Sequence, residues 1–148
     1  MDCYLIDVSL FSSHARTYVC KKWKQGHEPT GPPPTSIPTG HCVRDGAAEF
    51  RGYCYKFLGL DSSLTWFEAV DKCEDQSNNY QLASIHSERE SAFIKTMYTY
   101  LSEENHGTIF WIGASDANEE GKWVYTDSTS FDYTHWEANE PNNQVTLF

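Results

Sequence analysis

The sequence predicts an α+β fold in which two helices flank a small antiparallel sheet. Two stretches, near residues 66–73 and 93–101, repeat apolar residues at helical spacing. Short stretches rich in aromatic and branched residues, typical of strands, lie around them. The order is strand, helix, helix, then strands and loops, which favours the α+β class.

The first strand is expected within residues 51–59, RGYCYKFLG. A helix should follow Thr65, because Thr65 and Glu68 have the spacing of a capping box. The residues that then repeat at helical spacing are Trp66, Ala69, Val70 and Cys73. This pattern directs the Cys73 side chain into the core.

A second helix is expected to open at Ser87, with Glu90 three residues later. Its buried stripe would be Phe93, Ile94, Met97, Tyr98 and Leu101. Between the helices, QLASI predicts a short strand, and TIFWIGAS and KWVYTD predict two more after them.

A proline-rich stretch marks the clearest boundary in the chain. Residues 26–42, GHEPTGPPPTSIPTGHC, hold every proline except Pro141. We expect residues 26–41 to be a semi-rigid linker, since this composition cannot supply a core. Residues 1–25 would then be an extension outside a domain spanning residues 42–148, and the KKWK run would be a solvated basic patch.

Charge and cysteine content indicate the compartment and the class of partner. The net charge of −10 argues against nucleic acid as a partner. From Glu103 onward there are nine acidic residues and one basic residue, so this region either attracts cations or is a solvated acidic face. Five cysteines without C-x-x-C spacing favour disulfides over zinc, and therefore an extracellular location. No signal peptide or transmembrane segment is recognisable, which suggests part of a longer protein.

Catalytic motifs are not found. The six histidines have no HExxH spacing, and neither serine nor cysteine lies in a nucleophile elbow. We therefore expect a binding module and not an enzyme.

The elements in order resemble a C-type lectin-like domain. The matching pieces are CYKF, TWFEAVDKC, LASI, WIG, GKWVYTDST and HWEANEPNN. The resemblance implies a long irregular loop region that binds ligand, and it makes Cys42 and Cys54 the extra disulfide of the long form. The RTYVCKKW stretch is similar to the closing strand of such a domain. A domain end before a linker would suggest a tandem array like the mannose receptor family, with an unrelated extension as the alternative.

The EPN tripeptide carries the functional expectation. By resemblance, Glu140 and Asn142 bind the principal calcium ion, with the intervening proline in the cis form, and two neighbouring sugar hydroxyls complete the ligand shell. Oxygen ligands of this kind suit calcium. Glu before Asn is similar to the type that binds mannose, fucose and N-acetylglucosamine. Asp116 and Glu120, with Asn143, match positions of an auxiliary calcium site, with a polar turn as the alternative.

The family pattern continues beyond EPNN with further calcium ligands, a cysteine and a closing strand, which this sequence does not contain. We therefore expect a truncated domain, closing strands missing, that alone binds calcium weakly and sugar hardly at all. Cys73 is expected to be a buried free thiol, with pairing to Cys20 as the alternative, and the pairing of Cys3 stays open. The alternative function is a calcium-independent protein-binding or structural domain of a multidomain receptor.

Overall fold

The structure is a computed structural model that describes part of the chain. The described residues are 17–23, 42, 46–59, 64–76, 79–101, 110–136 and 140–141. Residues 26–41, the expected linker, lie outside them.

Five strands form the main sheet, in the order β2-β3-β1-β4, with β5 paired in parallel to β1. Their bounds are β1 Thr17–Trp23, β2 Ala48–Phe50, β3 Tyr53–Leu58, β4 Gln81–Leu82 and β5 Phe110–Trp111. All other pairs in this sheet are antiparallel. A separate antiparallel hairpin consists of β6 Ala114–Ser115 and β7 Val124–Tyr125.

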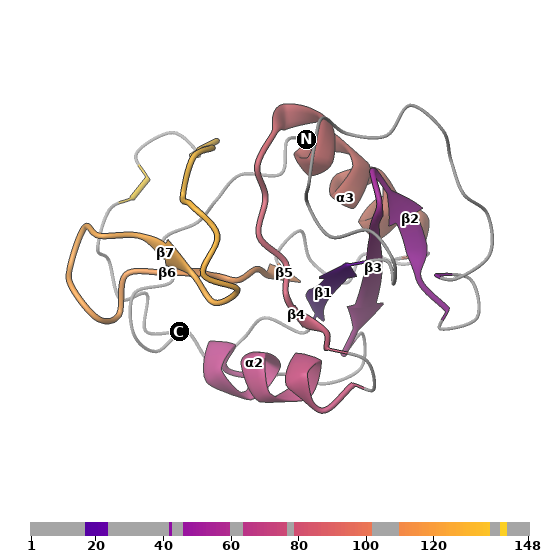
Figure 1. Cartoon of the computed structure of the whole chain (residues 1–148), viewed down its shortest axis with the longest axis horizontal. Helices are drawn as coiled ribbons and strands as arrows, with labels where there is room; N and C mark the ends of the chain where they lie inside the picture. The colour runs from indigo at the N-terminus through magenta and orange to yellow at the C-terminus, as the bar shows by residue number, and fades with distance from the viewer. Residues whose placement is uncertain are drawn as a thin grey trace.

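Two helices cover opposite faces of the main sheet, α2 (Trp66–Glu74) and α3 (Glu88–Leu101) (Figure 1). The capping box predicted for α2 is confirmed, because Thr65 Oγ1 accepts from the Glu68 amide and the Glu68 carboxylate accepts from the Thr65 amide. These bonds lower the pKa of Glu68. At the start of α3, the Glu90 amide donates to Ser87 Oγ. The predicted fold class, two helices with small antiparallel sheets, is confirmed.

The N-terminal segment corrects the expected domain boundary. Thr17–Trp23 is not an extension outside the domain; it is β1, between β3 on one side and β4 with β5 on the other. The physical reason is the alternation of its side chains. Tyr18 and Cys20 lie in the core cluster beneath α2, whereas Val19 lies in the cluster beneath α3. A strand buried on both faces belongs to the interior of a sheet.

The expectation that KKWK is a solvated basic patch is wrong at Lys21. This side chain is 4% exposed and follows the alternation of β1, so it points to the α3 side of the sheet. Its ammonium group lies 2.7 Å from the Glu90 carboxylate of α3. A buried charge is tolerated there because it is paired.

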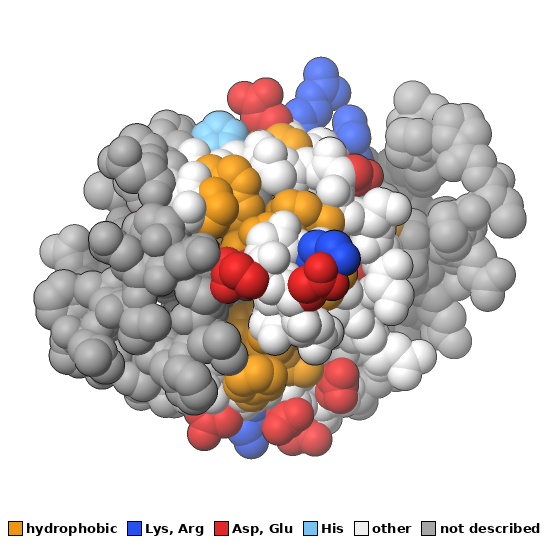
Figure 2. Space-filling view, turned by 90° about the vertical axis from the view of Figure 1, so that its left-hand side faces the viewer, with side chains coloured by type: hydrophobic (Ala, Val, Ile, Leu, Met, Phe, Trp, Pro, Cys, Tyr) orange, Lys and Arg blue, Asp and Glu red, His pale blue; other side chains and the backbone are white. Residues whose placement is uncertain are grey.

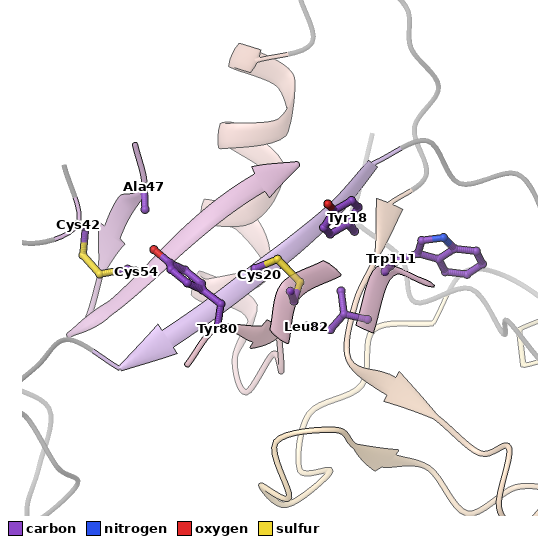
Figure 3. Packing of buried hydrophobic residues seen from close by; sticks show 10 residues of the cluster. Tyr18, Cys20, Cys42, Ala47, Cys54, Tyr80, Leu82 and Trp111 are labelled. Carbon is purple, nitrogen blue, oxygen red and sulfur yellow. A yellow bond between two sulfur atoms is a disulfide. The ribbon is translucent and has the colours of Figure 1, made fainter. Parts of the chain in front are cut away.

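Two disulfides fasten this core (Figure 3). Cys42 and Cys54 are joined, the pair that the sequence suggested. The expectation of a free thiol at Cys73 is wrong, because Cys73 of α2 is bonded to Cys20 of β1. The reason is the position of β1, which brings Cys20 into the same core cluster as Cys73. Both side chains are 0% exposed.

Gly113 joins the hairpin to the main sheet. Its amide donates to the Ala83 carbonyl, and its own carbonyl accepts from the Thr126 amide. The two chains approach so closely that a Cβ atom at this position would lie 2.7 Å from the Leu82 carbonyl oxygen. Glycine therefore permits the close approach of two backbones.

We expect Gly113→Ala to lower the free energy of unfolding by about 2 kcal/mol, because the added methyl group would force these backbones apart. Urea unfolding followed by tryptophan fluorescence measures the change. Gly121→Ala is the control, since nothing lies within 4 Å of an added Cβ there and only its positive φ of 76° is unfavourable. A smaller loss for Gly113→Ala than for Gly121→Ala would contradict the close approach.

Among the described residues, no helix is both long and apolar enough to cross a membrane.

Candidate functional site

The hairpin β6–β7 and the segment after it carry the residues that the sequence singled out. In Figure 1 the hairpin projects from the main sheet on the left, and the chain returns beside it toward residues 140–141. Figure 2 shows the face on this side, where acidic side chains lie among separate hydrophobic patches. Val124 is one hydrophobic residue of the hairpin that is half exposed.

An aromatic cluster holds the segment that leads to the EPN motif. The Trp136 ring meets the Trp123 ring edge to face, with their centroids 4.8 Å apart. Phe131, in the segment after β7, packs on the hairpin. Its ring centroid lies 6.1 Å from that of Trp123 and 5.1 Å from that of Tyr125. Aromatic pairs at such distances attract each other beyond the area they bury. Trp136, four residues before Glu140, is thereby fixed to the hairpin.

Glu140 and Pro141 are joined by a cis peptide bond, as the resemblance implies. The Glu140 side chain is partly exposed. Asn142 and Asn143, the other predicted ligands of this motif, lie outside the described residues.

Asp116 closes the turn between β6 and β7. It is 5% exposed, and its Oδ2 accepts from the Gly121 amide at 3.0 Å. Its carbonyl accepts from the Glu119 amide. An ionised carboxylate has about four acceptor positions, so this bond leaves room for a cation. Glu120, in the same turn, is exposed.

The predicted calcium ligands are therefore only partly brought together. The donor types suit calcium, since Asp116, Glu120 and Glu140 all offer carboxylate oxygens. Within the described part of the chain, however, no three His, Cys, Asp or Glu side chains form a group that could hold a metal ion. The calcium ligand set stays a prediction.

Sequence reasoning missed a buried polar network beneath the hairpin. The Lys21 ammonium group donates to the Ser84 carbonyl at 3.0 Å, to Ser84 Oγ at 3.3 Å and to Glu90. The Tyr55 hydroxyl also donates to Glu90, and Ser84 Oγ donates to Asp127. The one signal in the sequence was Lys21, which shares the alternation of Val19 and so falls on a buried face of the strand.

The network shifts the titration of its members. Burial would raise the pKa of Asp127, but hydrogen bonds from Ser84 and Thr129 and the charge of Lys21 outweigh it, so the pKa is lowered. Burial, with the negative charges of Glu90 and Asp127, raises the pKa of Tyr53 to about 12. Asp127 is thus an ionised acceptor at neutral pH.

His86 was also missed, because no spacing in the sequence distinguishes it from the other five histidines. Its ring lies between the end of β4 and the segment after β7. Nδ1 is 2.7 Å from Asp132 Oδ1, and Nε2 is 3.1 Å from Thr129 Oγ1. The Tyr125 ring meets it edge to face at 5.4 Å.

The family comparison matches residues 62–146 to the model described as "Lectin C-type domain". This match covers both helices and the whole candidate site. No solved structure matches the chain significantly.

Several curated relatives are also similar. A protein named C-type lectin from Micrurus corallinus is 41% identical over 94 residues, which are 63% of this chain and 56% of that protein. The galactose-specific lectin nattectin of Thalassophryne nattereri is 40% identical over 107 residues, 72% of this chain and 63% of that protein. The C-type lectin mannose-binding isoform of Notechis scutatus scutatus is 34% identical over 98 residues, 66% of this chain and 59% of that protein. The chain therefore spans less than two thirds of the length of these relatives.

Proposed function

The chain belongs to the C-type lectin domain family, and from this premise we propose that it binds carbohydrate through calcium at the segment ending in Glu140–Pro141–Asn142. The observation that carries the proposal is the anchoring of this motif. Trp136, four residues before Glu140, packs on Trp123 of the hairpin, and the Glu140–Pro141 peptide bond is cis. The Glu140 carboxylate offers oxygen ligands of the kind that calcium prefers.

In the proposed site, Glu140 and Asn142 would hold the principal calcium, and Asp116, Glu120 and Asn143 would hold an auxiliary ion. Bound calcium supplies coordination positions for two neighbouring sugar hydroxyls. The Glu140 carboxylate accepts a hydrogen bond from one hydroxyl, and the Asn142 amide donates to the other. Asp116 accepts from the Gly121 amide and so closes the turn, and its remaining lone pairs would be available to the auxiliary ion.

The proposed ligands are glycans of the mannose, fucose and N-acetylglucosamine type, free or on glycoproteins. The order Glu then Asn supports this choice. The relatives include one named for galactose and one named for mannose, so specificity has to be measured. Two disulfides support an extracellular location, since such bonds persist in oxidising compartments.

A tetravalent display of the 148-residue chain on streptavidin tests the proposal, because avidity raises weak single-site binding by about a hundredfold or more. We expect retention on immobilised mannan in calcium, with elution by a chelator and by free mannose. Free galactose should elute little.

Glu140→Gln with Asn142→Asp should abolish calcium-dependent retention on mannan and favour retention on immobilised galactose. Glu119→Gln is the matched control, since Glu119 pairs with Lys122 outside the proposed ligands, and it should leave retention unchanged. Retention that needs no calcium and is the same for the double variant as for the unaltered chain would support the alternative, a calcium-independent protein-binding or structural domain. Absence of any retention by the display would reject the proposal for this chain.

A further inference from the structure

The segment between β7 and the EPN motif is held from outside by one imidazole. Asp132 and Thr129, on that segment, contact the two ring nitrogens of His86 at 2.7 and 3.1 Å. The His86 side chain is 24% exposed and the Asp132 side chain 57% exposed. The ring therefore bridges the segment between β4 and α3 and the segment that follows β7.

The hydrogen bonds of Thr129 fix the role of Nε2. Thr129 Oγ1 lies 2.6 Å from Asp127 Oδ1, which also accepts from the Thr129 amide at 3.0 Å. Asp127 is ionised, as argued above, so it can only accept. The single hydroxyl proton of Thr129 must then lie toward Asp127. The Nε2 atom of His86, facing the lone pairs of that hydroxyl, has to donate.

Asp132 fixes the role of Nδ1 in the same way. A carboxylate is an acceptor only, and at 2.7 Å it requires a proton on the facing nitrogen. Both ring nitrogens are donors in this arrangement, which is the charged imidazolium form. Neutral His86 would oppose two lone pairs at one of the two contacts, whichever tautomer it adopts.

We propose that His86 is a positioning residue that, as an imidazolium, clamps residues 127–136, the described segment that leads to Trp136. Asp127 is the centre of this clamp. Its Oδ2 accepts from the Ser84 hydroxyl, which in turn accepts from Lys21. Its Oδ1 accepts from the Thr129 hydroxyl, which in turn contacts His86.

The charged or titratable groups near His86 come from four parts of the chain. Asp132 and Asp127 lie on the clamped segment, and Tyr125 of β7 packs against the ring. Glu90 of α3 accepts from the His86 backbone amide at 2.8 Å, and Lys21 of β1 lies behind Ser84.

The clamp gives the segment a pH dependence of definite sign. Loss of the ring proton as pH rises removes one of the contacts that hold the segment and so lowers its local stability. Carboxylate ligands of calcium act in the opposite sense, because they lose the metal as pH falls. The consequence for sugar binding rests on the proposed function, whereas the clamp itself does not.

Nitrogen-15 NMR of the imidazole rings in the 148-residue chain tests the protonation state. At about pH 7, within the range where histidine changes charge, we expect both His86 nitrogens to be protonated. Asp132→Asn is the matched variant, since its amide group can donate to a neutral Nδ1. This variant should show a neutral ring with its proton on Nε2. A neutral ring in the unaltered chain at this pH would overturn the proposal.

Hydrogen exchange supplies a readout that a merely structural role would not move. After correction for intrinsic rates, amides of residues 129–136 should exchange about tenfold faster at pH 8.5 than at pH 6.5. A factor of this size corresponds to the loss of about one hydrogen bond. Asp132→Asn should show equal protection at both pH values, and His86→Gln fast exchange at both. Equal protection at both pH values in the unaltered chain would overturn the clamp, whether or not the chain binds sugar.

Discussion

Replacing Lys21 with alanine is expected to lower the free energy of unfolding by about 3–5 kcal/mol, because it leaves a buried carboxylate without its charged partner. Among the described residues, Glu90 would keep the Tyr55 hydroxyl and the His86 amide as donors. The Ser84 carbonyl would lose its donor as well. Urea unfolding monitored by circular dichroism measures this loss.

Two further variants separate the ion pair from the bulk of the side chain. Lys22→Ala makes the same charge change one residue along β1, where the ammonium group lies over the Tyr80 ring at 4.4 Å, and should cost at most about 1 kcal/mol. Lys21→Met with Glu90→Gln should recover much of the loss, since glutamine can accept from His86 and donate to Tyr55. If Lys21→Ala were no worse than Lys22→Ala, the buried pair would have no role in stability.

The helices could be predicted because their signals are local. The capping box at Thr65 and Glu68 lies within four residues, and the apolar stripe of α2 lies within nine. The strand β3 and the disulfide between Cys42 and Cys54 were accessible for the same reason, since they are close in sequence.

The place of β1 could not be predicted because its contacts are distant along the chain. It pairs with residues 53–58, 81–82 and 110–111, and no local pattern chooses among such partners. Lys21 of this strand lies in a run of basic residues, which is a pattern typical of an exposed surface. Only the alternation with Val19 on the same face shows that the ammonium group must be buried.

The residues of the candidate site also fall into those with a local sequence signal and those without one. Glu140 and Asp116 were found because each lies in a short motif. The clamp was missed because His86, Asp132 and Thr129 are brought together by tertiary structure, 43 to 46 residues apart. Polar networks of this kind leave no periodic pattern in a sequence.

Removing the disulfide between Cys20 and Cys73 is expected to lower the free energy of unfolding by about 4 kcal/mol, from the entropy of a loop closed across 53 residues. Both cysteines are changed to alanine together, since a single change leaves a reactive thiol. Cys42→Ala with Cys54→Ala is the matched control. Its loop spans 12 residues, and the same relation gives about 3 kcal/mol.

The larger loss should come with a distinct structural effect, because this disulfide ties β1 to α2. Without it, amides of β1 should lose protection from hydrogen exchange before those of α3, whereas the control pair should leave β1 protected. Peptide mapping without reduction checks the premise in the unaltered chain. Recovery of Cys73 as a free thiol from oxidised protein would contradict it, and β1 would then be held without a covalent bond, by its strand hydrogen bonds, its buried side chains and Lys21.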